Sequence, residues 1–386
     1  MRNNWLAYGR QSISEDDIAA VVDVLHSDWL TQGPMIPEFE KRIATTCGAK
    51  YAIAFSNGTA ALHAAYYAAG IGVGDEIITT AMTFAATSNA ALYLGATPKF
   101  ADIDLATGLI SPSSIAPLID NKTKAIVAVD YAGHPSDIDE LQALANSANV
   151  AFIVDGAHSL GAFYKQRPVG ALADMTTFSF HAVKTITTGE GGMVLTNKED
   201  LCHKLKLFRT HGIEKNPAFL IDDEGPWYHE MQMLGYNYRL TDIQAALGIS
   251  QLSRLEQFID RRRQIAAAYR KHLQDSALFL ALQEKSFVKS AYHLFPVLVN
   301  KEKLERKQAV QELHKDNIGV QVHYIPSYKH PYYQIHVNGK EWQKKCPNTE
   351  EFYSRVLSLP IFPDMSDDDV ASVLTALDKL EHKYIG

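Results

Sequence analysis

Between residues 50 and 200 the chain alternates short apolar segments with helix-like segments, and this alternation constrains its fold more than any other feature. Candidate strands are Tyr51–Phe55, Glu76–Thr80, Pro98–Asp102, Ala125–Asp130 and Ala151–Asp155. Most are continuous apolar runs, as expected for strands covered by helices on both faces of a sheet. Helices are predicted between them at 59–69 and 84–94. The pattern predicts an α/β fold.

Polar residues stand at the ends of several of these strands, namely Asn57, Asp102, Asp130 and Asp155. In open α/β sheets, ligands bind beyond the carboxyl ends of the strands. We therefore expect these four positions to face the binding site.

The pattern changes after Thr241, where residues 242–273 have apolar side chains at helical spacing and are predicted to form one long helix or two in tandem. Further strands are predicted at 293–299 and 319–323, and helices near 307–315 and 367–383. This composition suits a small α+β domain. Because 386 residues exceed the usual size of one core, we divide the chain into a large domain with an N-terminal arm, residues 1–250, and a linker helix with a small C-terminal domain, residues 251–386.

Charge and cysteine content exclude several classes of protein. A net charge of -7 without a basic tail argues against a dedicated nucleic-acid binder. The cysteines, Cys47, Cys202 and Cys346, are far apart and form neither a zinc motif nor a disulfide framework. The N-terminus lacks an apolar signal core, and no run approaches the roughly 18 apolar residues of a membrane helix. We expect a cytoplasmic protein with no metal site, no membrane partner and no nucleic-acid partner.

A candidate phosphate site lies where the first strand meets its helix, at Ser56-Asn-Gly58-Thr59. Gly58 permits a tight turn, and Thr59 with the first free N–H groups of the helix can hold a phosphate. An ordinary glycine turn with a threonine cap explains the same residues equally well.

Lys184 and Asp155 are the candidate chemical groups. Asp155 ends a strand, and Lys184 follows the next strand candidate, which begins at Met175. Pyridoxal phosphate (PLP) needs such a pair, an amine to form a Schiff base and an acid to keep the pyridine nitrogen protonated. Each residue alone has an ordinary alternative, a surface lysine and a loop cap. His158 can hydrogen-bond Asp155 or the cofactor, or it is a structural histidine.

Three further residues surround this pair. Ser179 is placed to contact the same phosphate as Thr59. Phe84 opens a helix and can stack on the pyridine ring, although a core aromatic is nearly as good an explanation. The glycine-rich loop Thr187–Gly192 indicates close backbone approach to a substrate or a partner subunit.

The order phosphate turn, aromatic, Asp-x-x-His and Ser-Phe-x-x-x-Lys resembles fold-type I PLP enzymes, and is most similar to the sugar aminotransferases of the DegT/DnrJ/EryC1/StrS family. The matching stretches are Trp29–Pro34, Asn57–Thr59, Asp75–Thr79, Thr83-Phe84, Asp155–His158, Gly235–Leu240 and His323-Tyr-x-Pro326. The likeness covers nearly the whole chain. It implies an aspartate aminotransferase-like fold, with a mostly parallel, mixed seven-stranded sheet between helices in the large domain.

The resemblance also implies the chemistry. Within the family, the stretches Val127–Gly133 and Ser179–Gly192 look most like enzymes that aminate C4 of a UDP-linked 4-keto-6-deoxy-N-acetyl hexose with L-glutamate. Lys184 would bind PLP and carry the proton between the donor α-carbon and the cofactor, with Asp155 on the ring nitrogen.

Other site residues rest on the resemblance alone. Asn237 is similar to the family asparagine that reaches across a homodimer interface to the cofactor phosphate, which implies active sites shared between two subunits. The residues similar to those that line the sugar-nucleotide pocket are Tyr8, Asp28, Trp29, Leu30, Thr31, Gln321, Val322, His323 and Tyr324. Each of these residues also has a structural interpretation. Trp29 and Tyr324 can be aromatic residues of an interface or a core, and His323 can be an ordinary histidine of a strand.

Three alternatives stay open. The first is a related transaminase acting on another 4-keto sugar, for bacillosamine, lipid A or an O-antigen. The second is a C3 dehydratase, which carries histidine in place of the lysine, so Lys184 argues against it. The third is a non-catalytic PLP-binding regulator, which the absence of an added helix-turn-helix segment disfavours.

Overall fold

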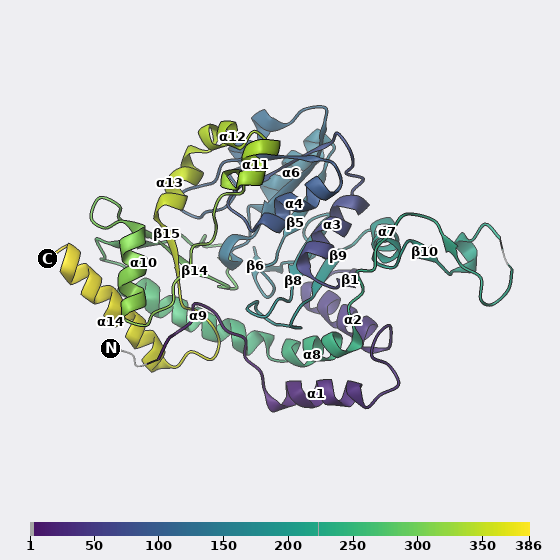
Figure 1. Ribbon diagram of the computed structural model, residues 1–386, viewed down its shortest axis with the longest axis horizontal. Coiled ribbons are helices and arrows are strands. Elements are labelled where there is room, and N and C mark those ends of the chain that lie inside the picture. The colour runs from purple at the N-terminus through teal and green to yellow at the C-terminus, as the bar shows by residue number, and fades with distance from the viewer. Residues whose placement is uncertain (1–3, 223) are drawn as a thin grey trace.

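The computed structural model describes residues 4–222 and 224–386. At its centre lies a seven-stranded sheet with the order β1-β9-β8-β5-β4-β2-β3 (Figure 1). Its strands are β1 (Tyr51–Phe55), β2 (Glu76–Thr80), β3 (Thr97–Ala101), β4 (Thr123–Val129), β5 (Ala151–Asp155), β8 (Met175–Ser179) and β9 (Gly192–Thr196). β9 runs antiparallel to both neighbours, and the other pairs are parallel. The predicted α/β fold with a mostly parallel mixed sheet is confirmed.

Helices cover both faces of this sheet. They are α2 (Met35–Cys47), α3 (Gly58–Ala68), α4 (Ala85–Tyr93), α6 (Ile138–Ala148), α7 (Glu199–Arg209) and α8 (Asp242–Leu252). In β1, Ile53 and Phe55 pack into one cluster with α3 and α7, whereas Ala52 and Ala54 pack into another with α2 and α8. Because successive strand residues point to opposite faces, both sets must be apolar, which explains the continuous apolar runs.

Side-chain caps define where two site-forming helices begin. The Asn57 side chain accepts a hydrogen bond from the Ala60 N–H at 2.8 Å, and α3 starts directly after it. Thr241 and Gln244 form a capping box at the start of α8. The predicted helix at 242–273 is two helices in tandem, α8 and α9 (Leu255–His272).

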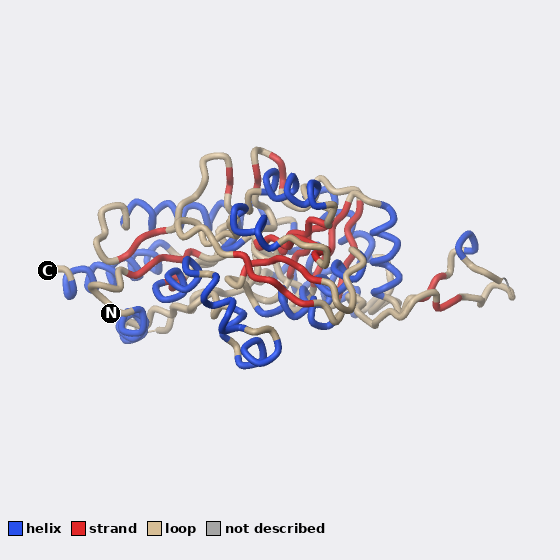
Figure 2. Tube along the Cα trace, turned by 90° about the horizontal axis from the view of Figure 1, so that it is seen from above, coloured by secondary structure: helices blue, strands red, loops and turns tan. Residues whose placement is uncertain are grey.

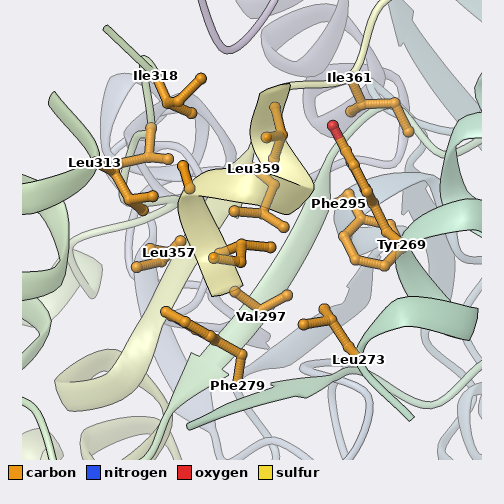
Figure 3. Close-up of a cluster of buried hydrophobic side chains, with 14 of the residues drawn as sticks. Tyr269, Leu273, Phe279, Phe295, Val297, Leu313, Ile318, Leu357, Leu359 and Ile361 are labelled. Carbon is orange, nitrogen blue, oxygen red and sulfur yellow. The ribbon is translucent and has the colours of Figure 1, made fainter. Parts of the chain in front are cut away.

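A second, antiparallel sheet of β12 (Phe279–Ala281), β14 (Phe295–Val299) and β15 (Val356–Leu359) forms the C-terminal part of the chain. It packs with α9, α10 (Arg306–Lys315) and α14 (Asp367–Tyr384) around a buried apolar cluster that includes Tyr269, Phe295 and Leu357 (Figure 3). Leu6 of the N-terminal segment belongs to the same cluster. The domain boundary at residues 250/251 stays a prediction.

The predicted strand at 319–323 is wrong. Gln321 makes an isolated bridge with Ser358, whereas the neighbouring Ile318 bridges Leu6. The backbone of this segment is thus divided between two partners within a few residues, so no continuous ladder forms.

The remaining helices and strands complete the described chain. The helices are α1 (Glu15–Leu25), α5 (Pro112–Ile115), α11 (Pro331–His336), α12 (Gly339–Lys345) and α13 (Pro347–Arg355), with 3₁₀ helices at Ala116–Leu118, Tyr131–Gly133, Pro217–Phe219 and Ser327–Lys329. The strands are β6 (Phe163–Tyr164), β7 (Arg167–Pro168), β10 (Ile213–Glu214), β11 (Glu230–Met231) and β13 (Val288–Lys289). Within the described part of the chain, no helix is both long and apolar enough to cross a membrane.

One segment projects away from the body of the molecule, as both ribbon and tube show (Figures 1 and 2). This arm, residues 211–222 and 224–236, is held by the β10–β11 pairing. It carries large apolar side chains that are exposed, among them Ile221 (86%), Trp227 (72%) and Leu234 (75%). Exposed apolar side chains gathered on one segment are typical of surfaces that pack against another protein chain.

Candidate active site

A cavity of about 700 Å³ opens at the carboxyl ends of the central strands. Eleven of the residues predicted from the sequence line it: Tyr8, Asn57, Gly58, Thr59, Phe84, Asp155, His158, Ser179, Lys184, His323 and Tyr324. They come from the N-terminal segment, the starts of α3 and α4, the ends of β5 and β8, and the C-terminal part of the chain. The topology of the sheet therefore brings together residues that are far apart in sequence.

Lys184 lies in the turn that follows β8, and its backbone N–H donates to the His181 carbonyl at 2.9 Å. Burial lowers the pKa of its amine to about 8, although the charge of Asp155 opposes the shift. An ammonium group loses favourable hydration when it is buried. A substantial fraction of the amine is thus neutral near pH 8, as a nucleophile or a general base requires.

Asp155 ends β5 and is only 6% exposed. Its Oδ2 accepts a hydrogen bond from the Thr87 hydroxyl at 2.5 Å, and its Oδ1 accepts one from the Ala157 N–H at 3.1 Å. Burial raises the pKa of the Asp155 carboxyl, whereas these two donors and Lys184 oppose the rise. A cation beside this carboxylate would be strongly favoured.

The start of α3 and the end of β8 form a small cradle. A Cβ atom at position 58 would lie 3.0 Å from the Cβ of Ser179, so glycine is what permits the approach. The first N–H groups of a helix have no partner within the helix and point toward an anion. Gly58, Thr59 and Ser179 therefore suit a phosphate group.

The buried His158 and the partly buried Tyr324 make a pair at the side of the cavity. The Tyr324 hydroxyl and His158 Nε2 are 2.9 Å apart. Burial holds the pKa of His158 well below its ordinary value, and Lys184 and His323 lower it further. His158 is thus a neutral imidazole, which has one N–H donor and one acceptor nitrogen. The exposed ring of Phe84 lies 6.0 Å from that of Tyr324, at the mouth of the cavity.

The structure also places site residues that the sequence did not reveal. His293 lines the cavity, and its ring centroid is 4.4 Å from that of His158, although the two are distant in the chain. Thr87 donates a hydrogen bond to Asp155, and Thr83, which the sequence marked only as part of a matching stretch, lines the cavity as well. The spacing of these two threonines on either side of Phe84, at a helix start, was the sequence signal that could have indicated their place in the site.

The expectation that all polar strand ends face the site is wrong for two of them. Asp102 accepts hydrogen bonds from the backbone N–H groups of Asn348 and Thr349 and so caps the start of α13. Asp130 accepts from the Ser136 N–H at 2.9 Å and the Ser159 hydroxyl at 2.6 Å and is fully buried. Both carboxylates satisfy backbone and hydroxyl donors of neighbouring segments.

Several predicted residues lie away from this cavity within one chain. Asn237 is exposed at the base of the arm, and the exposed stretch Asp28–Thr31 connects α1 to α2. Gln321 is exposed, and Val322 packs against a buried cluster beside the site. Their proposed roles stay predictions.

The cavity fits PLP in three respects. Lys184 supplies an amine with a lowered pKa, Asp155 a buried carboxylate, and Gly58 with Ser179 an anion cradle. These are the groups that the aldehyde, the ring nitrogen and the phosphate of PLP require.

Comparison with known proteins gives a consistent result. The model of the DegT/DnrJ/EryC1/StrS aminotransferase family matches residues 11–378. The chain is 40% identical to the spore coat polysaccharide biosynthesis protein SpsC of Bacillus subtilis, over 97% of both chains. It is 37% identical to the UDP-4-amino-4,6-dideoxy-N-acetyl-β-L-altrosamine transaminase of Campylobacter jejuni, over 99% of this chain and 100% of that one. Among solved structures, the Helicobacter pylori aminotransferase PseC, involved in pseudaminic acid biosynthesis, matches with a TM-score of 0.92 and 36% identity, over 99% of this chain and 100% of that chain.

Proposed function

Because the chain belongs to the DegT/DnrJ/EryC1/StrS aminotransferase family and is a PLP-dependent sugar aminotransferase, we propose that it aminates C4 of a nucleotide-linked 4-keto-6-deoxy hexose with L-glutamate as donor. The proposed acceptor is UDP-2-acetamido-2,6-dideoxy-β-L-arabino-hexos-4-ulose. The product is then UDP-4-amino-4,6-dideoxy-N-acetyl-β-L-altrosamine, an intermediate of pseudaminic acid biosynthesis. The convergence of Lys184, Asp155 and the Gly58–Ser179 cradle in one cavity carries the proposal.

PLP, when bound, supplies an aldehyde that condenses with amines and a ring that delocalises negative charge. Lys184 would accept a proton from the α-carbon of glutamate and donate it to the cofactor. Asp155 would keep the ring nitrogen protonated, and the cradle at Gly58 and Ser179 would hold the phosphate. Phe84, which is exposed and lines the cavity, would stack on the ring.

The sugar is proposed to lie between the cofactor site and the C-terminal part of the chain. Tyr8, His323 and Tyr324 line the same cavity as Lys184. The ring of Tyr8 lies 5.1 Å from that of His323. A pyranose ring has an apolar face and polar hydroxyls, so aromatic rings with hydrogen-bonding groups suit it.

We propose that the working form is a homodimer whose two active sites share residues. Asn237 lies in extended chain between Tyr236 and Tyr238, whose rings stack at 4.9 Å. Since neighbouring side chains in extended backbone point in opposite directions, Asn237 points away from its own tyrosine pair, which supports a role outside its own chain. The apolar arm that ends beside it offers the surface for that contact.

We also propose a cytoplasmic location. The three cysteines are unpaired and buried. Free thiols are typical of proteins in reducing compartments.

The test is an assay of the purified, PLP-loaded protein with ¹⁵N-glutamate and a panel of nucleotide 4-keto sugars. The panel holds the proposed UDP sugar, its epimer at C5 and a dTDP-linked 4-keto-6-deoxy hexose. Mass spectrometry should find the ¹⁵N-labelled amino sugar from the proposed acceptor at the highest kcat/KM. Turnover of the dTDP sugar alone, or of none, would overturn the assignment.

A second candidate keeps the reaction and changes the sugar. The 40% identity to a protein named for spore coat polysaccharide biosynthesis favours an amino sugar of a surface polysaccharide. Preference for the C5 epimer in the same panel would select this candidate.

A further inference from the structure

Two threonines, Thr83 and Thr87, lie on either side of Phe84 at the start of helix α4. Thr83 and Thr87 are four residues apart, so their side chains lie on one side of the helix start. Thr83 is 2% exposed and Thr87 is fully buried. Their hydroxyl oxygens are 2.7 Å apart. This pair lies beside the cofactor cavity and plays no part in the mechanism above.

The number of hydroxyl protons determines which threonine of this pair donates the hydrogen bond. A hydroxyl group has a single proton to donate. Thr87 donates its proton to Oδ2 of Asp155, so Thr83 must be the donor in the contact between the two threonines. The resulting chain runs from Thr83 to Thr87 to Asp155, and each bond strengthens the next by polarising it.

We propose that Thr87, supported by Thr83, is a positioning residue that keeps the Asp155 carboxylate ionised and turned toward the ring nitrogen of the cofactor. This inference rests on the proposed role of Asp155. Thr87 occupies a lone pair of Oδ2 and the Ala157 N–H one of Oδ1, so both oxygens are held in orientation. The remaining lone pairs are then available to a group bound in the cavity, which Asp155 lines.

The backbone of this unit is itself held in place. The Tyr66 hydroxyl of α3 donates to the Thr87 carbonyl at 2.8 Å, which joins α3, α4 and β5. The other titratable groups whose charge interacts with Asp155 are Lys184, Tyr66, Tyr324 and Asp130. Substitution of Thr87 leaves all of them unchanged.

The test compares cofactor affinity for PLP and for 1-deaza-PLP, which lacks the ring nitrogen. Thr87→Val keeps the side-chain volume and removes the hydroxyl. We expect it to weaken PLP binding to the apo-protein by about 10-fold, the effect of one hydrogen bond to a charged group, and 1-deaza-PLP binding by less than about twofold. Thr87→Ser should restore most of the PLP affinity. Fluorescence quenching by the cofactor measures both dissociation constants.

A matched control is Thr79→Val. Thr79 is also fully buried, but its hydroxyl has no hydrogen-bond partner among the described residues. This variant should bind both cofactors like the wild type. If Thr87→Val does not fold, Thr83→Val, which removes only the first donor of the chain, should weaken PLP binding by about twofold and leave 1-deaza-PLP binding unchanged.

The outcomes separate this inference from the function beneath it. If Asp155→Asn weakens PLP but not 1-deaza-PLP, whereas Thr87→Val binds PLP normally, the role of Thr87 is refuted and that of Asp155 stands. Equal weakening of both cofactors by Thr87→Val indicates lost packing and also refutes the inference. If Asp155→Asn itself does not distinguish the two cofactors, the proposed role of Asp155 fails.

Discussion

The cavity floor, formed by Lys184 and Asp155, and the projecting arm differ in how their side chains are exposed to solvent. At the floor, Lys184 and Asp155 are desolvated and held by neighbouring segments of the same chain. On the arm, Trp227 and Leu234 expose apolar surface that one chain leaves uncovered. This difference teaches that a single chain is sufficient to position the reactive groups of the cavity. The exposed residues of the arm, by contrast, gain a defined role only when another protein surface packs against them.

The largest expected effect is at the floor. Lys184→Ala removes the amine that binds PLP and moves the proton, so kcat/KM for the amino sugar should fall by more than about 10³-fold. Mass spectrometry of the sugar product measures it. Lys198→Ala, which loses only an exposed ion pair with Asp174, should keep activity. Undiminished product from Lys184→Ala would refute the mechanism.

The arm is tested next. Trp227→Ser removes a large exposed aromatic and should weaken homodimer formation by about 30-fold, as loss of a central interface residue does. Sedimentation velocity across a concentration series measures the change. Tyr332→Ser, which changes an exposed aromatic on α11, is the control and should leave the dimer intact. Equal dimerisation of both variants contradicts the proposed interface.

A mixing experiment tests whether Asn237, at the base of the arm, contributes to the cavity that contains Lys184. Asn237→Ala should weaken PLP binding by about 10-fold, through one lost hydrogen bond to a phosphate. If Asn237 contributes to the active site of the partner subunit, an equal mixture of co-refolded Lys184→Ala and Asn237→Ala chains should regain activity. About half of the dimers are then mixed, and each mixed dimer holds one intact site out of two. The mixture should therefore contain about one quarter of the wild-type number of intact sites. Activity no higher than the sum of the separate variants would place Asn237 outside the partner's site.

The pH dependence of cofactor uptake tests the floor by itself. The pKa of Lys184 is lowered to about 8, and the neutral amine is the form that attacks the aldehyde. Incorporation of PLP into the apo-protein should therefore be slow below pH 8 and reach a plateau above it, as followed by visible absorbance. Asp155→Asn removes a charge that favours the ammonium form, so its midpoint should move to lower pH. A midpoint near the ordinary lysine pKa would argue against burial of the amine.

The smallest expected effect on activity is at a strand end outside the site. Asp102→Asn weakens the cap of α13 and should lower the free energy of unfolding by about 1 kcal/mol, as urea denaturation measures. Its kcat/KM should stay within about twofold of the wild type. A loss comparable to that of Asp155→Asn would mean that Asp102 does act at the site.

Much of the fold follows from local patterns. The bounds of β1, β2 and β5 are those expected from their apolar runs, because strands buried on both faces leave an unambiguous signal. The segment at 319–323 misled us, since its apolar alternation is real but its backbone is divided between Leu6 and Ser358. Which partner a strand-like segment finds is a matter of long-range packing.

By itself, the sequence determined the α/β architecture through its periodicity and indicated Lys184 and Asp155 through residue chemistry at strand ends. The order of the motifs indicated a cofactor through its resemblance to a known family. Only the tertiary structure decided which polar strand ends serve the site and which, like Asp102, cap a distant helix. It also brought His293 against His158 and Thr87 against Asp155. Contacts between residues so far apart depend on how helices and strands pack, and local sequence carries no record of that packing.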